Sequence, residues 1–86
     1  MLKAGTILTR YGRVKGSYFG NEEDTFAQRS LPRTTDVSQY HKYRLKKDMP
    51  AEKAIIAPWF GQPGGGVQYK ISNEVFAEFD EYLQVI

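Results

Sequence analysis

Four side chains of this 86-residue sequence stand out for the chemistry they could do: Arg10, Arg29, Gln68 and the lone histidine, His41. A guanidinium can hold a phosphate or diphosphate through charge-assisted, bidentate hydrogen bonds. A glutamine amide both donates and accepts, so it can contact the hydroxyl groups of a sugar. The structural alternatives are surface or ion-paired arginines, a strand glutamine that faces water, and a structural histidine.

The acidic residues offer no persuasive catalytic pair. Most glycosidases place two carboxylates on either side of the bond they cleave. Glu22, Glu23 and Asp24 instead form a cluster in a loop. The C-terminal acids fall on a surface helix: Glu74, Glu78, Asp80 and Glu81. A conventional two-carboxylate mechanism is therefore not expected.

The segment 57–69, APWFGQPGGGVQY, is the hardest to explain as structure alone. Its consecutive glycines lose much backbone entropy on ordering, but they let the backbone approach a ligand closely. Trp59 and Phe60 place apolar side chains before the glycines, and Gln68 places a polar side chain after them. The segment could therefore cradle a nucleotide, or it could be a hairpin loop with Trp59 as a core anchor. It matches neither a phosphate-binding loop ending in Gly-Lys-Ser/Thr nor a dinucleotide-binding fingerprint.

Metal binding and disulfides are not expected. The sequence has one histidine and no cysteine, and its acids show no calcium-loop spacing. Charge is uneven: residues 1–53 hold 11 Lys and Arg against 6 Asp and Glu, whereas residues 54–86 hold one against four. A basic front half suits an anionic ligand, although uneven surface charge is also common. No stretch is long enough for a signal peptide or a membrane span.

The elements that must position these residues are mostly short strands. Short runs rich in β-branched or aromatic residues and bounded by Gly or Pro predict strands over 3–11, 40–47, 53–57 and 66–71. Segment 12–36 is expected to be a loop. Ser72 can cap a helix that ends near Tyr82, followed by a closing strand over 83–86. We therefore expect a single domain over residues 1–86 of α+β class, mainly antiparallel sheet.

An ordered set of motifs makes the sequence resemble a known family. Segment 57–69 is similar to the signature of the tuberculosis necrotizing toxin domain. Other pieces agree with that family in the right order: Gly5-Thr6-Ile7-Leu8, Arg10-Tyr11-Gly12, Gly16-Ser17-Tyr18-Phe19, Arg29-Ser30-Leu31-Pro32 and Tyr40-His41-Lys42-Tyr43. The similarity covers about residues 3–70. It implies two small twisted antiparallel sheets with a cleft between sheet and loops, and one C-terminal helix.

The resemblance implies an NAD⁺ or NADP⁺ glycohydrolase that releases nicotinamide and ADP-ribose. By position, Arg29 and Gln68 correspond to the family's essential arginine and catalytic glutamine. His41 aligns with a histidine implicated in some members, and Arg10 with a second arginine on the phosphate side. Four further residues are expected to bind substrate: Tyr11 and Tyr18 by stacking, Trp59 as an apolar wall, and Gly65 in a glycine floor.

The missing acid is chemically acceptable for this reaction. Nicotinamide is a cationic pyridinium in NAD⁺ and leaves as a neutral molecule, so the leaving group needs no proton. The resemblance implies no cofactor, no metal, and neither nucleic acid nor membrane as a partner. It also implies a cognate immunity protein, and secretion as the C-terminal part of a larger toxin that acts in the target-cell cytoplasm.

Two other functions stay open at this point. A metal-independent ribonuclease would suit the basic half and His41, but no carboxylate partner for that histidine is evident. A non-catalytic module could use Trp59 and Phe60 as an aromatic groove for a peptide or single-stranded nucleic acid. Such a module has less need for three consecutive glycines.

Overall fold

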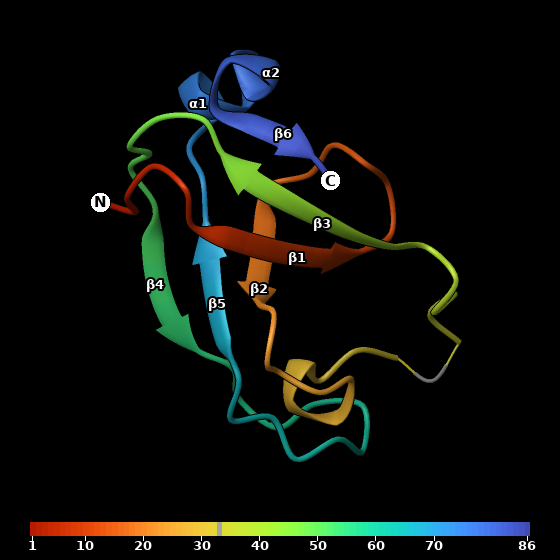
Figure 1. Cartoon of the computed structure of the whole chain (residues 1–86). Helices are drawn as coiled ribbons and strands as arrows, with labels where there is room; N and C mark the ends of the chain where they lie inside the picture. Colours follow the sequence, from red (N-terminus) through yellow and green to blue (C-terminus); the bar gives the residue numbers. More distant parts are fainter. Residues whose placement is uncertain (33) are drawn as a thin grey trace.

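The computed structural model describes residues 1–32 and 34–86. This part of the chain forms six strands and three short helices, whose arrangement is drawn in Figure 1. The strands are β1 (Ile7–Tyr11), β2 (Tyr18–Asn21), β3 (Tyr40–Leu45), β4 (Glu52–Ile55), β5 (Val67–Lys70) and β6 (Leu83–Val85). The helices are the 3₁₀ helix η1 (Ala27–Arg29) and the α-helices α1 (Asn73–Ala77) and α2 (Phe79–Tyr82).

The strands form one antiparallel sheet in the order β4-β5-β2-β1-β3-β6. In Figure 1, β4, β5 and β2 stand nearly upright, whereas β1, β3 and β6 run across the view. β1 joins these two halves, because it pairs with β2 along one edge and with β3 along the other. The helix η1 and the segment after β4 lie together beyond one end of the upright strands.

The α+β class with mainly antiparallel sheet is confirmed. The expectation of two separate sheets is not met, because the pairing of β1 with β2 makes the two strand groups continuous. The sequence missed β2, which lies within the segment 12–36 expected to be a loop. This strand has only four residues, and the glycine and asparagine among them are poor strand formers.

The core lies on one face of this twisted sheet. Alternation along paired strands points Leu8, Phe19 and Tyr43 to the same side, and all three are buried. The ring of Phe19 packs edge-on against Tyr43, with centroids 5.4 Å apart. The other buried apolar residues are Leu45, Met49, Ile71, Val75, Phe79 and Leu83.

The C-terminal segment closes this core. Ser72 caps α1 as expected, since its hydroxyl oxygen accepts a hydrogen bond from the Val75 amide at 3.2 Å. The single helix that was expected is divided, because Glu78 departs from helical geometry at φ −110° and ψ 32°. The closing strand is confirmed as β6. Within the described residues, no helix has the length and apolar character needed to cross a membrane.

The packing makes Leu8 a sensitive position. Leu8 is fully buried at the centre of the sheet, so Leu8→Ala leaves a cavity that the surrounding strands fill only in part. We expect a loss of about 3 kcal/mol in the free energy of unfolding, measured by urea denaturation. Val37→Ala is the control, because Val37 is exposed and its truncation should cost less than about 0.5 kcal/mol. Equal losses in the two variants would contradict this core.

Candidate functional site

A row of three cross-strand neighbours forms the base of the candidate site. Thr9 on β1 lies opposite Gly20 on β2, and Gly20 lies opposite Gln68 on β5. Directly opposed residues of antiparallel strands point to the same face, so these three share the face opposite Leu8 and Phe19. Since the middle residue is a glycine, the row has a gap in its centre.

The guanidinium of Arg29 lies over this gap. A Cβ atom on Gly20 would come within 3.0 Å of Arg29 Nη1 and 3.3 Å of Cζ, closer than an ordinary van der Waals contact. The missing side chain therefore makes room for the guanidinium between Thr9 and Gln68. In this way the structure brings the expected essential arginine and glutamine together, from segments far apart in the sequence.

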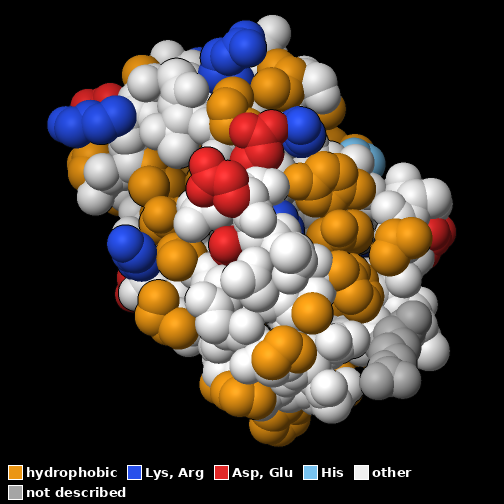
Figure 2. Space-filling view, turned by 60° about the horizontal axis from the view of Figure 1, so that its bottom comes forward, with side chains coloured by type: hydrophobic (Ala, Val, Ile, Leu, Met, Phe, Trp, Pro, Cys, Tyr) orange, Lys and Arg blue, Asp and Glu red, His pale blue; other side chains and the backbone are white. Residues whose placement is uncertain are grey.

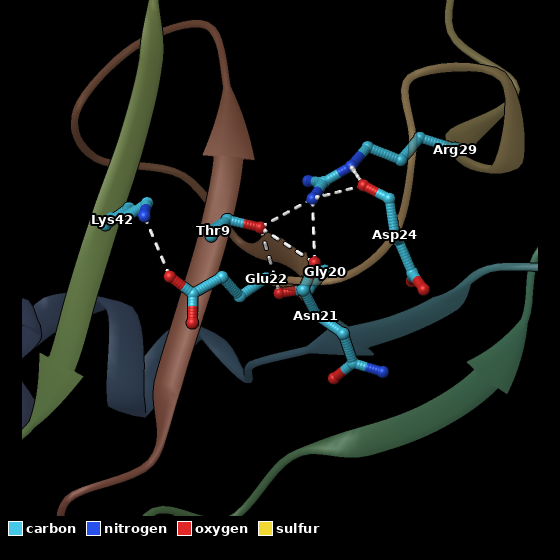
Figure 3. A network of polar contacts seen from close by, with 7 residues as sticks. All are labelled: Thr9, Gly20, Asn21, Glu22, Asp24, Arg29 and Lys42. Atoms are coloured by element: carbon cyan, nitrogen blue, oxygen red, sulfur yellow. Dashed lines mark hydrogen bonds and ion pairs between the residues drawn. The ribbon is translucent and has the colours of Figure 1, made fainter.

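Arg29 is held by oxygen atoms that carry no formal charge (Figure 3). Its Nη2 donates to the hydroxyl of Thr9 at 2.7 Å and to the carbonyl of Asn21 at 2.8 Å. Both Nε and Nη2 donate to the carbonyl of Asp24 at 3.2 Å. Nη1 has no hydrogen-bond acceptor among the residues that the structure describes.

Aromatic rings enclose the same cation. The guanidinium carbon lies 5.2 Å from the ring centroid of Tyr11 and 5.6 Å from that of Tyr40. Tyr11 is itself fixed by Phe26, whose ring meets it edge-on at 5.5 Å. Cation–π contacts of this kind stabilise a cation without neutralising it.

The site therefore keeps its positive charge. Arg29 is 92% buried, with a relative exposure of 8%, and none of the described acidic side chains forms an ion pair with it. The nearest acid in sequence, Asp24, turns its carboxylate toward the Val67 amide, which donates to it at 2.8 Å. A buried charge without a counter-ion is costly. An anionic ligand would compensate it.

An open pocket of about 350 Å³ lies at this position. Its lining residues come from β1, β2, β5, η1 and the segments after η1 and β4: Thr9, Arg10, Tyr11, Tyr18, Phe19, Gly20, Arg29, Leu31, Ile56 and Gln68. Small-molecule sites typically measure about 300–1,000 Å³ and combine apolar walls with a few polar groups. The pocket has this character, since the Arg29 guanidinium, the Thr9 hydroxyl and the Gln68 amide lie among apolar and aromatic residues.

A larger hollow of about 480 Å³ lies elsewhere, over residues 50–52 and 70–74. Its charged lining side chains, Glu52, Lys70 and Glu74, are all exposed to solvent. Exposed charges of mixed sign make a weak ligand site, because water and salt screen them. The smaller pocket, with its buried guanidinium, is the better candidate.

Arg10 is among the residues that line the pocket, but its side chain leaves β1 on the face opposite Thr9, where its guanidinium carbon lies 5.9 Å from the ring centroid of the buried Phe19. Its Nε donates to the Arg13 carbonyl and its Nη1 to the Tyr18 carbonyl, each at 2.8 Å. Gly16 leaves room for this side chain, since a Cβ atom there would lie 2.2 Å from the guanidinium and would displace it. Burial lowers the pKa of Arg10 from its ordinary value, and the nearby Tyr43 partly offsets this effect.

Five of the eight residues expected at the site line the pocket: Arg10, Tyr11, Tyr18, Arg29 and Gln68. The structure does not bring His41 to it. His41 lies opposite Arg10 on the core side of β3, whereas its neighbours Tyr40 and Lys42 point to the pocket side. Its Nε2 lies 2.9 Å from the carbonyl oxygen of Gly12, where it ties down the loop after β1.

Trp59 also lies outside the pocket lining. It begins a tight turn in which Phe60 and Gly61 adopt positive φ angles of 53° and 72°, and it pairs with Gln62 at the end of the turn. Trp59 is 63% exposed and is therefore not the core anchor that the alternative interpretation required. Figure 2 brings this end of the molecule forward and shows apolar side chains gathered over its lower part.

The glycine triplet is a packing element, and Gly65 does not line the pocket. The amides of residues 64, 65 and 66 donate to the carbonyls of Ala27, Ile56 and Gln28 at 3.3, 2.8 and 3.0 Å. The backbone groups expected to face a ligand are thus used to dock the segment against η1 and the end of β4. Gly64 is required, because a Cβ would lie 2.6 Å from the Ile56 carbonyl.

Sequence reasoning missed Thr9, Gly20 and Asp24. Thr9 and Gly20 gain their roles from strand register, which no local pattern specifies. Asp24 was seen only as one of three loop acids. Tyr18 and Gly20 are two residues apart, which would place them on the same face of a strand. The many loop-forming residues around them favoured the prediction of a loop instead.

No three His, Cys, Asp or Glu side chains in residues 1–32 and 34–86 come together in a way that could hold a metal ion. The ordinary ligands of zinc and calcium are such side chains in groups of three or more. The expectation that no metal is needed stays a prediction.

A family model for the tuberculosis necrotizing toxin matches residues 1–84. The chain belongs to the tuberculosis necrotizing toxin family. A structure of tuberculosis necrotizing toxin complexed with its immunity factor is similar to this family member, with a TM-score of 0.65 and 26% sequence identity. That similarity covers 94% of this chain and 48% of the other.

A curated relative of this toxin-family chain is the conidial surface nicotinamide adenine dinucleotide glycohydrolase of Aspergillus fumigatus. The two sequences are 33% identical over 91 residues, which cover 96% of this chain and 39% of the fungal protein. The chain thus spans less than half the length of both known proteins.

Adding bulk at Gly20 should displace Arg29. We expect Gly20→Val to weaken the binding of inorganic pyrophosphate at least tenfold, measured by calorimetry at low salt, because the side chain occupies the place of the guanidinium. Ala54→Val is the control. It adds apolar bulk to β4 in the same cross-strand row, beyond Gln68. Unchanged pyrophosphate affinity in Gly20→Val would show that the guanidinium does not need the gap.

Proposed function

We propose that this chain is an NAD⁺ glycohydrolase, active on NADP⁺ as well, which cleaves the bond between nicotinamide and ribose. The observation that carries the proposal is the buried guanidinium of Arg29, held by neutral oxygens, beside Gln68 in a pocket. The chain's family and its 33% identity to a fungal NAD glycohydrolase support it.

Arg29 would bind the diphosphate of the substrate. Its Nε and Nη2 are engaged by the protein, so the guanidinium is held in place before substrate arrives. A preorganised donor loses little freedom on binding, so more of its interaction energy contributes to affinity. Arg10, whose guanidinium lies on the other face of β1, would add a second positive charge near the diphosphate without contacting it.

Gln68 would orient the ribose that carries the nicotinamide. Its amide can donate to one ribose hydroxyl and accept from another. Tyr18, half exposed, would stack on a base of the substrate. Tyr11 would do so less freely, because its ring already packs on Arg29 and Phe26.

The proposed reaction needs no general acid. The bond between C1′ and the pyridinium nitrogen breaks, and its electron pair returns to that nitrogen, so nicotinamide leaves neutral. Water adds to the electron-poor C1′ and releases one proton to solvent, which gives ADP-ribose. The protein's part is to hold the diphosphate and the ribose so that this charge can develop, and no metal or further cofactor enters the scheme.

The family and the fungal relative indicate an exported, toxin-type protein. We further propose that the chain is the toxic part of a larger secreted protein and acts in the target-cell cytoplasm. The similar toxin structure contains an immunity factor. By analogy, this chain should have a cognate immunity protein, and an acidic segment of that partner would suit the positive charge of Arg29 in the pocket.

Loss of either main group should abolish most NAD⁺ cleavage. For Arg29→Lys and Gln68→Ala we expect kcat/KM to fall about 100-fold, because lysine lacks the planar fork and alanine lacks the amide. Release of nicotinamide is followed by chromatography in the presence of EDTA. Full activity in either variant would remove that residue from the mechanism.

Matched controls are available in the same sheet. Arg44→Lys on β3 and Gln84→Ala on β6 change the same residue types at exposed positions, and both should keep wild-type activity. RNA incubated with the wild-type chain should keep its length. Loss of RNA without loss of NAD⁺ would indicate a ribonuclease instead.

Expression in a bacterial cytoplasm should be toxic. We expect the wild-type chain to lower cellular NAD⁺ at least tenfold and to stop growth, whereas the Arg29→Lys chain at equal abundance should do neither. NAD⁺ is measured in cell extracts by an enzymatic cycling assay. Growth arrest with normal NAD⁺ would contradict the proposed mode of toxicity.

A further inference from the structure

Asp24 lies between the two groups to which the proposed mechanism gives the main roles. Its carbonyl contacts Arg29, and its carboxylate contacts the amide of the residue before Gln68. We propose that Asp24 is a positioning residue, which orients Arg29 and Gln68 together without neutralising the arginine. This inference rests on the proposed function.

The main chain of Asp24 fixes the direction of the guanidinium. Its carbonyl oxygen accepts from both Nε and Nη2 of Arg29, each at 3.2 Å. Together with the hydroxyl of Thr9 and the carbonyl of Asn21, this leaves the guanidinium plane little freedom to turn. In Figure 3 the Asp24 carbonyl faces the guanidinium.

The side chain of Asp24 fixes the start of β5. Figure 3 shows its carboxylate pointing away from Arg29. Oδ2 accepts a hydrogen bond from the Val67 amide at 2.8 Å, and Val67 directly precedes Gln68. A backbone amide held by a carboxylate is a strong, charge-assisted contact. It anchors the strand one residue before the glutamine side chain.

The third glycine of the triplet provides room for this contact. A Cβ atom on Gly66 would lie 2.8 Å from Asp24 Oδ2 and 2.9 Å from the Gln28 carbonyl. Any side chain at this position would therefore push the carboxylate from its place. The glycine at position 66 is thus explained by its close approach to the Asp24 carboxylate and the Gln28 carbonyl.

The direction of the carboxylate also matters for charge. A carboxylate turned toward Arg29 would form an ion pair and cancel the charge available to a diphosphate. Because Asp24 offers its neutral carbonyl instead, Arg29 is oriented while its charge stays available. The Asp24 carboxylate instead accepts a hydrogen bond from the Val67 amide, and its negative charge strengthens that contact.

The test compares three variants of the whole chain. Asp24→Ala removes the acceptor, Asp24→Asn keeps an acceptor oxygen without the charge, and Glu23→Ala changes the adjacent, exposed acid. For Asp24→Ala we expect kcat for NAD⁺ to fall at least tenfold, since a displacement of about 1 Å can cost about 100-fold. Asp24→Asn should stay within about threefold and Glu23→Ala within about twofold of wild type.

A second measurement reads the contact directly. Amide hydrogen exchange at Val67, followed by NMR in the native state, should be slow in the wild-type, Asp24→Asn and Glu23→Ala chains and fast in Asp24→Ala. A purely structural role would lower the melting temperature of Asp24→Ala without changing kcat of the folded protein. A kcat near the wild-type value in Asp24→Asn, together with a low kcat in Asp24→Ala, is therefore the decisive evidence for positioning.

The possible failures differ from one another. An active wild-type chain whose Asp24→Ala variant keeps full kcat would overturn the positioning role and leave the proposed function intact. A wild-type chain that does not cleave NAD⁺ would overturn the proposed function and, with it, this inference. If Asp24→Ala does not fold, the exchange rate of the Val67 amide in the wild-type chain is the test instead. Fast exchange of that amide would overturn the proposal.

Discussion

The candidate site depends on one interaction, the burial of a guanidinium among neutral partners. Arg29 is almost fully enclosed, yet its hydrogen bonds go to a hydroxyl and two backbone carbonyls, and the rings of Tyr11 and Tyr40 lie close to its guanidinium. Each contact stabilises the cation without supplying negative charge. Burial of a cation without a counter-ion is costly, so the binding of an anion beside Arg29 would be favourable.

The sheet makes this burial possible through strand register. Thr9, Gly20 and Gln68 lie side by side only because β1, β2 and β5 pair as they do. A shift of one residue in β2 would replace Gly20 by a bulky neighbour and would turn the row to the core face. The same register keeps Leu8 and Phe19 in the core, so apolar packing and the site are secured by one set of backbone hydrogen bonds.

The glycine-rich segment supports the site from outside the pocket. Its amides dock it onto η1 and the end of β4, and this holds η1 beside the sheet. Because Arg29 is the last residue of η1, the segment helps to set where the guanidinium enters. The glycine-rich motif thus stabilises the position of η1, whereas the groups that face a ligand come from the strands and from η1.

Local signals in the sequence were enough to predict most elements and to identify residue types suited to the chemistry. The pattern of β-branched residues gave most strands, Ser72 marked the start of α1, and the ordered motifs pointed to the family and to Arg29 and Gln68. Such signals depend on near neighbours in the chain, so they can be recognised without coordinates. The strand β2 and the division of the C-terminal helix were not predicted, because the residues there have only weak local preferences for these conformations.

Only the tertiary structure decided which of these residues meet. It brought Arg29 beside Gln68 across the gap at Gly20, separated His41 from them by the alternation of β3, and used the glycine amides for packing. It also gave Asp24 a role that its position in an acidic loop did not indicate. Each of these outcomes is set by pairing between distant segments, where a single residue of register moves a side chain from one face of the sheet to the other.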